Sequence, residues 1–287
     1  MSSSSHLSNE ALEGYESTSD PESGTYNITI SSENVTMQKS SRGLYRGLFP
    51  KAETLGCFMV VFSTCASLAC MEYMGIKGGI MENAATAALS IAIIIFAFGE
   101  ISRAHLNPAI SISFAIVGPF PWVLVTMYVL AQLGGCVLGS LAGRLVYDTK
   151  LDALLTKPTQ GLGAAFSVEF VATSLVMFLA ATLSTNKPSA GRFSGFVMGL
   201  AVGLGVILSG HLSGGSMNPA RSLGPAIVAC NFDHMWIYVV APTFGAIFGG
   251  LLQRALRLQG WTNNDILPND QHVMPLDLSV GITNYRG

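Results

Sequence analysis

The sequence predicts an all-α membrane protein in which six transmembrane helices and two re-entrant half-helices form an inverted internal repeat. Three observations support this fold class. The 287 residues are 50% hydrophobic and 11% charged, whereas a soluble domain carries roughly 25% charged residues. Six apolar segments approach the ~20 residues that a helix needs to span a bilayer. The triplet Asn-Pro-Ala also occurs twice, at 107–109 and 218–220.

Residues 1–51 are expected to form a disordered cytoplasmic tail. They are rich in Ser, Glu, Thr and Asn and contain few large apolar residues, so they cannot build a core. Basic residues crowd the start of the first apolar segment, which is typical of the cytoplasmic side. These are Lys39, Arg42, Arg46 and Lys51. The last residues, 258–287, are expected to form a second cytoplasmic tail.

The apolar segments cover 52–71, 84–101, 122–143, 163–183, 193–210 and 235–256. Because their number is even, both termini are expected on one side of the membrane. The N-terminal basic cluster shares its side with Lys187, Arg192, Arg254 and Arg257, while Lys77, Arg144, Lys150 and Lys157 fall on the other. The side with more basic residues is predicted to be cytoplasmic.

Two shorter apolar runs, Ala109–Val117 and Ala220–Ala229, each begin at one of the triplets. About ten residues cannot cross a bilayer as a helix, so we interpret these runs as re-entrant half-helices. Proline is favoured at the first helical position, and asparagine is a preferred N-cap. Each asparagine is therefore expected to cap its half-helix and to offer an amide N–H to a pore. The two triplets are Asn107, Pro108, Ala109 and Asn218, Pro219, Ala220.

The second half of the chain repeats the first. A channel domain over 52–257 divides into repeat one, 52–143, and repeat two, 163–256. Three helices plus a half-helix form an odd-numbered unit, so the second copy must be inverted across the membrane, as in many transport proteins. Matched small-xxx-small pairs, Gly135 with Gly139 and Gly245 with Gly249, predict close helix packing.

A charged residue at membrane depth, Arg221, marks a functional site by default. It could also be a structural tie to loop carbonyls, and both roles can hold together. The two half-helix N-termini place roughly half a positive charge each at the pore centre, which opposes cations and protons. His105 has no partner at ligand spacing and is expected to be structural. The five cysteines show no metal-ligand spacing and are expected to be buried thiols.

With these features in place, the chain resembles the aquaporins over about residues 45–258. Within them, Ser213–Ala226, Phe120–Trp122 and Trp236–Tyr238 are similar to the plant nodulin-26-like intrinsic proteins. The resemblance implies an aquaporin-like bundle. The sequence contains no enzyme signature and no basic cluster for nucleic acid, so we expect no catalytic activity, no cofactor or metal, and no nucleic-acid partner. The resemblance also implies a homotetramer with one pore per subunit; the membrane is expected to be the plasma membrane.

The resemblance also implies a selectivity filter formed by Ala87, Val206, Gly215 and Arg221. The small residues among them resemble the boric-acid-permeable members of subfamily seven, so the expected solutes are boric acid, glycerol, urea, other metalloid hydroxides and some water. Glu53 and Glu169 are expected to brace the re-entrant loops. Loop backbone is expected to line the pore at Ala104, His105, Leu106, Gly214 and Ser216.

One departure from the family concerns Glu100 and Arg103, where its members usually carry His and Gly. Their spacing of three allows a mutual ion pair if the helix continues that far. Three alternatives to a solute channel of this kind are a water-selective channel, a coupled carrier and a structural membrane junction protein. A carrier would need more intramembrane carboxylates than two, and a junction protein would not need Arg221.

Overall fold

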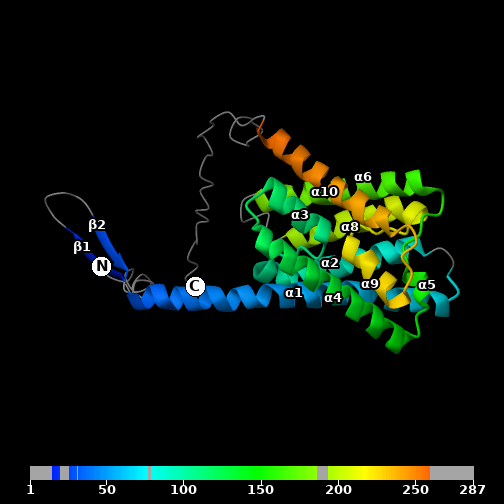
Figure 1. The fold of residues 1–287 in the computed structure, drawn as a ribbon, viewed down its shortest axis with the longest axis horizontal. Helices are drawn as coiled ribbons and strands as arrows, with labels where there is room; N and C mark the ends of the chain where they lie inside the picture. Colours follow the sequence, from blue (N-terminus) through cyan, green and yellow to red (C-terminus); the bar gives the residue numbers. More distant parts are fainter. Residues whose placement is uncertain (1–14, 20–25, 31, 77–78, 186–192, 259–287) are drawn as a thin grey trace, which may run out of the picture.

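The structure is a computed structural model, and it describes residues 15–19, 26–30, 32–76, 79–185 and 193–258. Its elements are β1 (Tyr15–Ser19), β2 (Tyr26–Ile30), α1 (Ser32–Tyr73), α2 (Ile80–Ser102), α3 (Pro108–Val117), α4 (Trp122–Tyr147), α5 (Leu151–Leu154), α6 (Leu162–Thr185), α8 (Ser194–Ser213), α9 (Pro219–Ala229) and α10 (Met235–Leu258). The long helices run side by side along one axis (Figure 1).

Six of these helices are long and apolar enough to cross a membrane. They are Gly47–Tyr73 of α1, α2, α4, α6, α8 and Met235–Arg257 of α10. They correspond one to one to the six predicted segments, and α3 and α9 correspond to the predicted half-helices. The fold class predicted from the sequence is therefore confirmed, and the chain is an integral multi-pass membrane protein.

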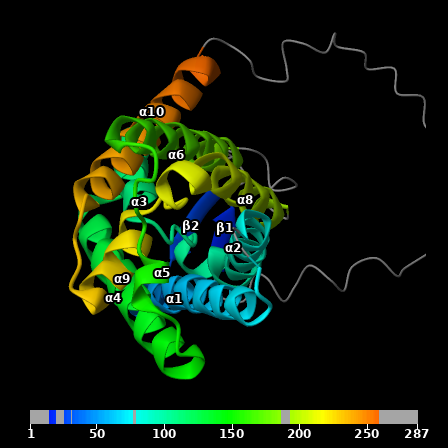
Figure 2. The same cartoon turned by 90° about the vertical axis from the view of Figure 1, so that its right-hand side faces the viewer.

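The helices pair in a pattern that repeats between the two halves. α1 packs on α4 and α6 packs on α10, while α9 packs on α4 and α3 packs on α10. α2 and α8 pack on each other, so each contact in one half has a counterpart in the other. Seen along the bundle, these helices surround a common centre (Figure 2). This is the arrangement expected from an inverted repeat.

The predicted glycine pairs lie where helix backbones meet. A Cβ at Gly135 would lie 2.2 Å from the carbonyl oxygen of Thr54, and one at Gly245 would lie 2.3 Å from that of Phe170. No other residue fits at these distances, because backbone atoms of α1 and α6 would have to move. The α2–α8 contact uses the same device, which the sequence analysis missed. Its small residues are Ala84, Ala88 and Ala92 on α2 and Gly195, Gly199 and Gly203 on α8.

The N-terminal stretch differs from the expected disordered tail. β1 and β2 pair as antiparallel strands, and α1 begins at Ser32 rather than near residue 52. Tyr26–Ile30 is rich in aromatic and β-branched residues, which favour strands. Glu33, Met37, Gln38 and Lys39 are good helix formers that extend α1 beyond its apolar part.

The start of α1 and the end of α10 project from the same end of the bundle (Figure 1), as an even number of spans requires. The predicted C-terminal tail beyond Leu258, Lys77, and the loop with Lys187 and Arg192 lie outside the described residues. The prediction of buried thiols holds for Cys57, Cys65 and Cys136 but is wrong for the exposed Cys70 and Cys230. The exposed pair lies at helix ends, where neighbouring helices cover less of the surface.

Candidate functional site

A cavity of about 2040 Å³ runs through the centre of the bundle. At the end where α1 starts, Val117 and Arg254 line it, and at the other end Ala153 and His211 do. Both half-helix loops contribute to its wall between these ends. Because the cavity is lined by residues from both ends of the bundle, it is the path that a solute would take.

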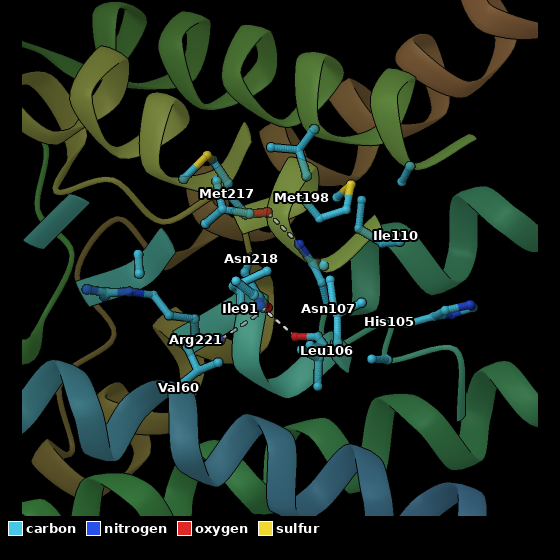
Figure 3. A pocket seen from close by; sticks show the side chains of 18 of the residues that line it. Val60, Ile91, His105, Leu106, Asn107, Ile110, Met198, Met217, Asn218 and Arg221 are labelled. Carbon is cyan, nitrogen blue, oxygen red and sulfur yellow. Dashed lines mark hydrogen bonds between the residues drawn. The ribbon is translucent and has the colours of Figure 1, made fainter. Parts of the chain in front are cut away.

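The two asparagines of the triplets meet at the middle of this cavity (Figure 3). Each side-chain oxygen caps its own half-helix, Asn107 accepting from Ala109 N at 2.9 Å and Asn218 from Ala220 N at 3.0 Å. Each amide nitrogen donates to the opposite loop, Asn107 to the Met217 carbonyl at 2.8 Å and Asn218 to the Leu106 carbonyl at 2.7 Å. An amide nitrogen has two hydrogens, so one on each asparagine is left for a solute.

The prolines and alanines of the triplets do not line the cavity. Pro108 and Pro219 occupy the first helical positions of α3 and α9 and are buried with Ala109 and Ala220. The missing proline N–H costs nothing there, since it would have no partner inside the helix. These four residues fix the half-helix starts, and the asparagines provide the polar groups.

A buried carboxylate holds each loop from behind. Glu53 accepts hydrogen bonds from His105 N at 3.0 Å and Leu106 N at 2.7 Å. Glu169 accepts from Ser216 N at 2.9 Å and Met217 N at 2.5 Å. Both glutamates are fully buried. The non-helical backbone of each loop thus has protein acceptors on one side, as it must have at membrane depth.

Further polar side chains hold the loops in place, and the sequence analysis did not identify them. The Tyr128 hydroxyl donates to the Ser102 carbonyl at 2.8 Å, and the Tyr238 hydroxyl donates to the Ser213 carbonyl at 2.7 Å. The two serines stand at equivalent places in the two repeats, and so do the tyrosines. The signal that could have found them is this repetition of polar residues, Tyr128 with Tyr238 and Ser102 with Ser213, between the two halves.

The first loop has an additional buried amide, Gln132. Its nitrogen donates to Glu53 at 2.8 Å and to the Ser111 hydroxyl at 3.1 Å. The second repeat has Pro242 inside α10 at the corresponding place. The second loop instead uses hydroxyls, with Ser222 joined to Thr156 at 2.8 Å and to Ser216 at 2.5 Å.

The four residues expected to form the filter, Ala87, Val206, Gly215 and Arg221, all line the cavity. Gly215 has φ +66, and a Cβ there would lie 3.5 Å from the Val206 Cα, so a side chain would have room but would strain the backbone. The Arg221 guanidinium donates to the carbonyl of Leu154 at 3.3 Å. This bond holds the guanidinium at the cavity wall.

The loop residues expected to line the pore are among the residues that line this cavity. They are Ala104, His105, Leu106, Gly214 and Ser216. The His105 ring points away from the asparagines (Figure 3) and packs on Phe114 and Phe120 with centroids 4.9 and 4.6 Å apart. Its Nδ1 lies 3.1 Å from the Ser111 hydroxyl. Through these contacts the His105 side chain helps to hold the first loop in place.

The ion pair allowed by the spacing of Glu100 and Arg103 is absent from the described residues, where ion pairs join Lys150 to Glu72 and Lys157 to Asp152. The reason is that α2 ends at Ser102. Arg103 takes the left-handed conformation, with φ 64. This turns its side chain away from the helical position that would have placed it beside Glu100. The condition for the ion pair, a helix that continues to Arg103, is therefore not met.

The sequence is similar to that of a known family of membrane proteins. The sequence profile described as Major intrinsic protein matches residues 41–253. The chain is 45% identical over 209 residues to "Probable aquaporin NIP7-1" of Arabidopsis thaliana, which covers 72% of this chain and 76% of that protein. It is 37% identical over 211 residues to "Aquaporin NIP3-1" of Oryza sativa subsp. japonica, covering 72% and 68%. The resemblance stated from the sequence is confirmed.

One solved structure supports the fold. The X-ray structure of the aquaglyceroporin from Plasmodium falciparum is similar with a TM-score of 0.65. The alignment covers 74% of this chain and 97% of that chain, at 23% sequence identity. At this identity the similarity concerns the arrangement of the helices alone.

Proposed function

The chain belongs to the major intrinsic protein family of membrane channels, and from this premise we propose that it passes small neutral solutes, with boric acid as the main one. Glycerol, urea, other metalloid hydroxides and some water are expected to pass as well. Transport is expected to be passive, because the polar groups that the described residues present to the cavity suit a neutral solute.

The observation that carries this proposal is the set of residues that line the cavity at the expected filter. Ala87, Val206 and Gly215 give the cavity small, apolar walls, while Arg221 presents a fork of N–H donors. Boric acid is flat and has three hydroxyl groups, so it needs donors on one side and free width on the other. Glycerol has the same needs, which is why both are expected to share the path.

The asparagine pair supports the exclusion of ions. The N-termini of α3 and α9 meet there, and each carries about half a positive charge from its helix dipole. The free amide hydrogen of Asn107 and that of Asn218 can bind a neutral hydroxyl oxygen but offer nothing to a cation. Protons and metal cations are therefore expected to be excluded.

A swelling assay with the purified protein in lipid vesicles tests the proposal. Boric acid, glycerol, urea and water permeability should be compared at equal protein content. Ala87→Trp places an indole across the filter, so it should lower boric acid and glycerol flux much more than water flux. Val206→His should act in the same direction by adding a second polar wall.

The matched control is Leu89→Trp, which adds the same indole on the same helix. Leu89 is 64% exposed on the outer surface of the described helices and does not line the cavity. It should leave the solute-to-water ratio unchanged. An unchanged ratio in Ala87→Trp would mean that selection occurs elsewhere, and a wild type that passes water alone would favour the water-selective alternative.

We also expect a homotetramer in the plasma membrane with both termini in the cytoplasm. The basic residues Arg254 and Arg257, at the end of the bundle that carries both described chain ends, support this orientation. Accessibility of the two termini to protease in sealed cells, and the mass of the detergent-solubilised particle, test these expectations.

A further inference from the structure

Arg103 is held in a backbone conformation that suits glycine. Its φ is 64, and Ala104 follows with φ 45. The equivalent residues of the second loop are Gly214 and Gly215, with φ +85 and +66. A side chain in this region costs free energy that glycine does not. Strained backbone of this kind is enriched at functional sites.

The Arg103 guanidinium is available to a solute. It lines the cavity and is exposed, and within the described part of the chain no hydrogen bond or ion pair to it occurs. Two other cavity arginines do have partners, since Arg221 binds the Leu154 carbonyl and Arg254 binds the Val117 carbonyl, each at 3.3 Å.

Arg103 and Arg221 lie on opposite sides of the asparagine pair. Arg221 follows Asn218 in α9, whereas Arg103 precedes Asn107 in the other loop. α3 and α9 occupy opposite halves of the bundle along its axis (Figure 1). Arg103 is four positions before Asn107, so their Cα atoms lie within about 14 Å of each other. A solute that passes the asparagines therefore meets a guanidinium before and after them.

We propose that Arg103 is a second barrier to cations, which keeps the pore closed to protons and metal ions even when the charge of Arg221 is lost. The inference rests on the proposed function. Among the described cavity-lining residues, Glu100 is the one acid beside four arginines, the remaining one being Arg257. Walls of low dielectric constant strengthen the field of such a charge along a pore. A neutral solute is not repelled by this charge and can accept hydrogen bonds from the guanidinium.

The test measures proton leak into vesicles that hold a pH-sensitive dye, under an imposed potassium diffusion potential. Arg221→Gln removes the charge but keeps an amide N–H donor on the side chain. Wild type, Arg103→Gly and Arg221→Gln should all remain nearly as tight as empty vesicles. The double variant Arg221→Gln with Arg103→Gly should leak at least about ten times more than either single variant, which is about 1.4 kcal/mol of lost barrier.

Three further variants in the Arg221→Gln background separate charge from structure. Arg103→Lys should stay tight, because it keeps the charge, whereas Arg103→Met should leak like Arg103→Gly. Arg144→Met removes an exposed arginine outside the cavity and should change nothing. Arg221→Val provides a second background if Arg221→Gln does not reconstitute.

A double variant that leaks no more than Arg221→Gln alone would overturn the proposal. So would equal leaks from the Lys and Met variants, or a single Arg221→Gln variant that already leaks like the double. Glycerol and boric acid flux is measured in the same vesicles. Absence of glycerol and boric acid flux in the wild type would refute the proposed function. This flux is measured independently of the proton leak.

Discussion

Replacing Glu169 by alanine should destabilise the second loop by about 2–6 kcal/mol. The carboxylate accepts hydrogen bonds from Ser216 N at 2.9 Å and Met217 N at 2.5 Å, and all three residues are buried. Each buried N–H left without an acceptor costs about 1–3 kcal/mol. The Ser213 hydroxyl also donates to the carboxylate, but it keeps the Ser209 carbonyl at 2.9 Å, so it adds little to the sum.

Glu169→Gln should cost roughly half as much, about 1–3 kcal/mol. Its amide oxygen can still accept from one of the two backbone N–H groups, while its amide nitrogen faces the other. Because this loop carries Gly215 and leads into Arg221, the solute-to-water permeability ratio should also fall in both variants. The measurements are unfolding of the detergent-solubilised protein and vesicle permeability at equal protein content.

The control is Glu82→Gln, an exposed glutamate in the first turn of α2. It should cost at most about 1 kcal/mol, the value of a carboxylate near a helix N-terminus. If Glu169→Ala were as stable as Glu82→Gln and kept the wild-type permeability ratio, the loop would not depend on this carboxylate. The account of the loop given above would then be wrong.

Three further outcomes are expected. Boron flux should fall as pH rises through the pKa of boric acid, because the fraction of neutral solute falls; vesicle uptake across a pH series checks this, and constant flux would contradict it. Arg103→Gly should stabilise the protein by about 0.5–1 kcal/mol, because glycine adopts the left-handed conformation without strain. Arg144→Gly, in the last turn of α4, should destabilise it by about 1 kcal/mol. Thermal unfolding measures both variants, and equal changes in stability would argue against backbone strain at Arg103. Gly135→Ala should destabilise the protein by about 1–3 kcal/mol or more, because its Cβ would lie 2.2 Å from the Thr54 carbonyl oxygen. Gly134→Ala should be neutral or stabilising, because its Cβ would meet nothing within 4 Å. Equal unfolding free energies for the two variants would contradict close packing at Gly135.

The sequence by itself determined the spans, the half-helices and the inverted repeat. These features depend on local properties, namely the length of an apolar run and the N-cap signal of Asn107 and Asn218. The bilayer makes such signals dependable, because every backbone polar group inside it must be satisfied within the protein. The role of Glu53 and Glu169 in bracing the loops was expected only from the resemblance to the family.

Only the tertiary structure decided which groups meet. The amide of Asn107 donates to the carbonyl of Met217, and the hydroxyl of Tyr238 donates to the carbonyl of Ser213. No local sequence pattern predicts hydrogen-bond partners so far apart in the chain. Arg103 is the clearest case. A helix that continued to Arg103 would have placed its side chain beside Glu100. α2 instead ends at Ser102, and the left-handed conformation of Arg103 points the side chain in another direction. The direction of a side chain depends on backbone dihedral angles that the packing of the loops imposes, and local sequence patterns do not predict these angles.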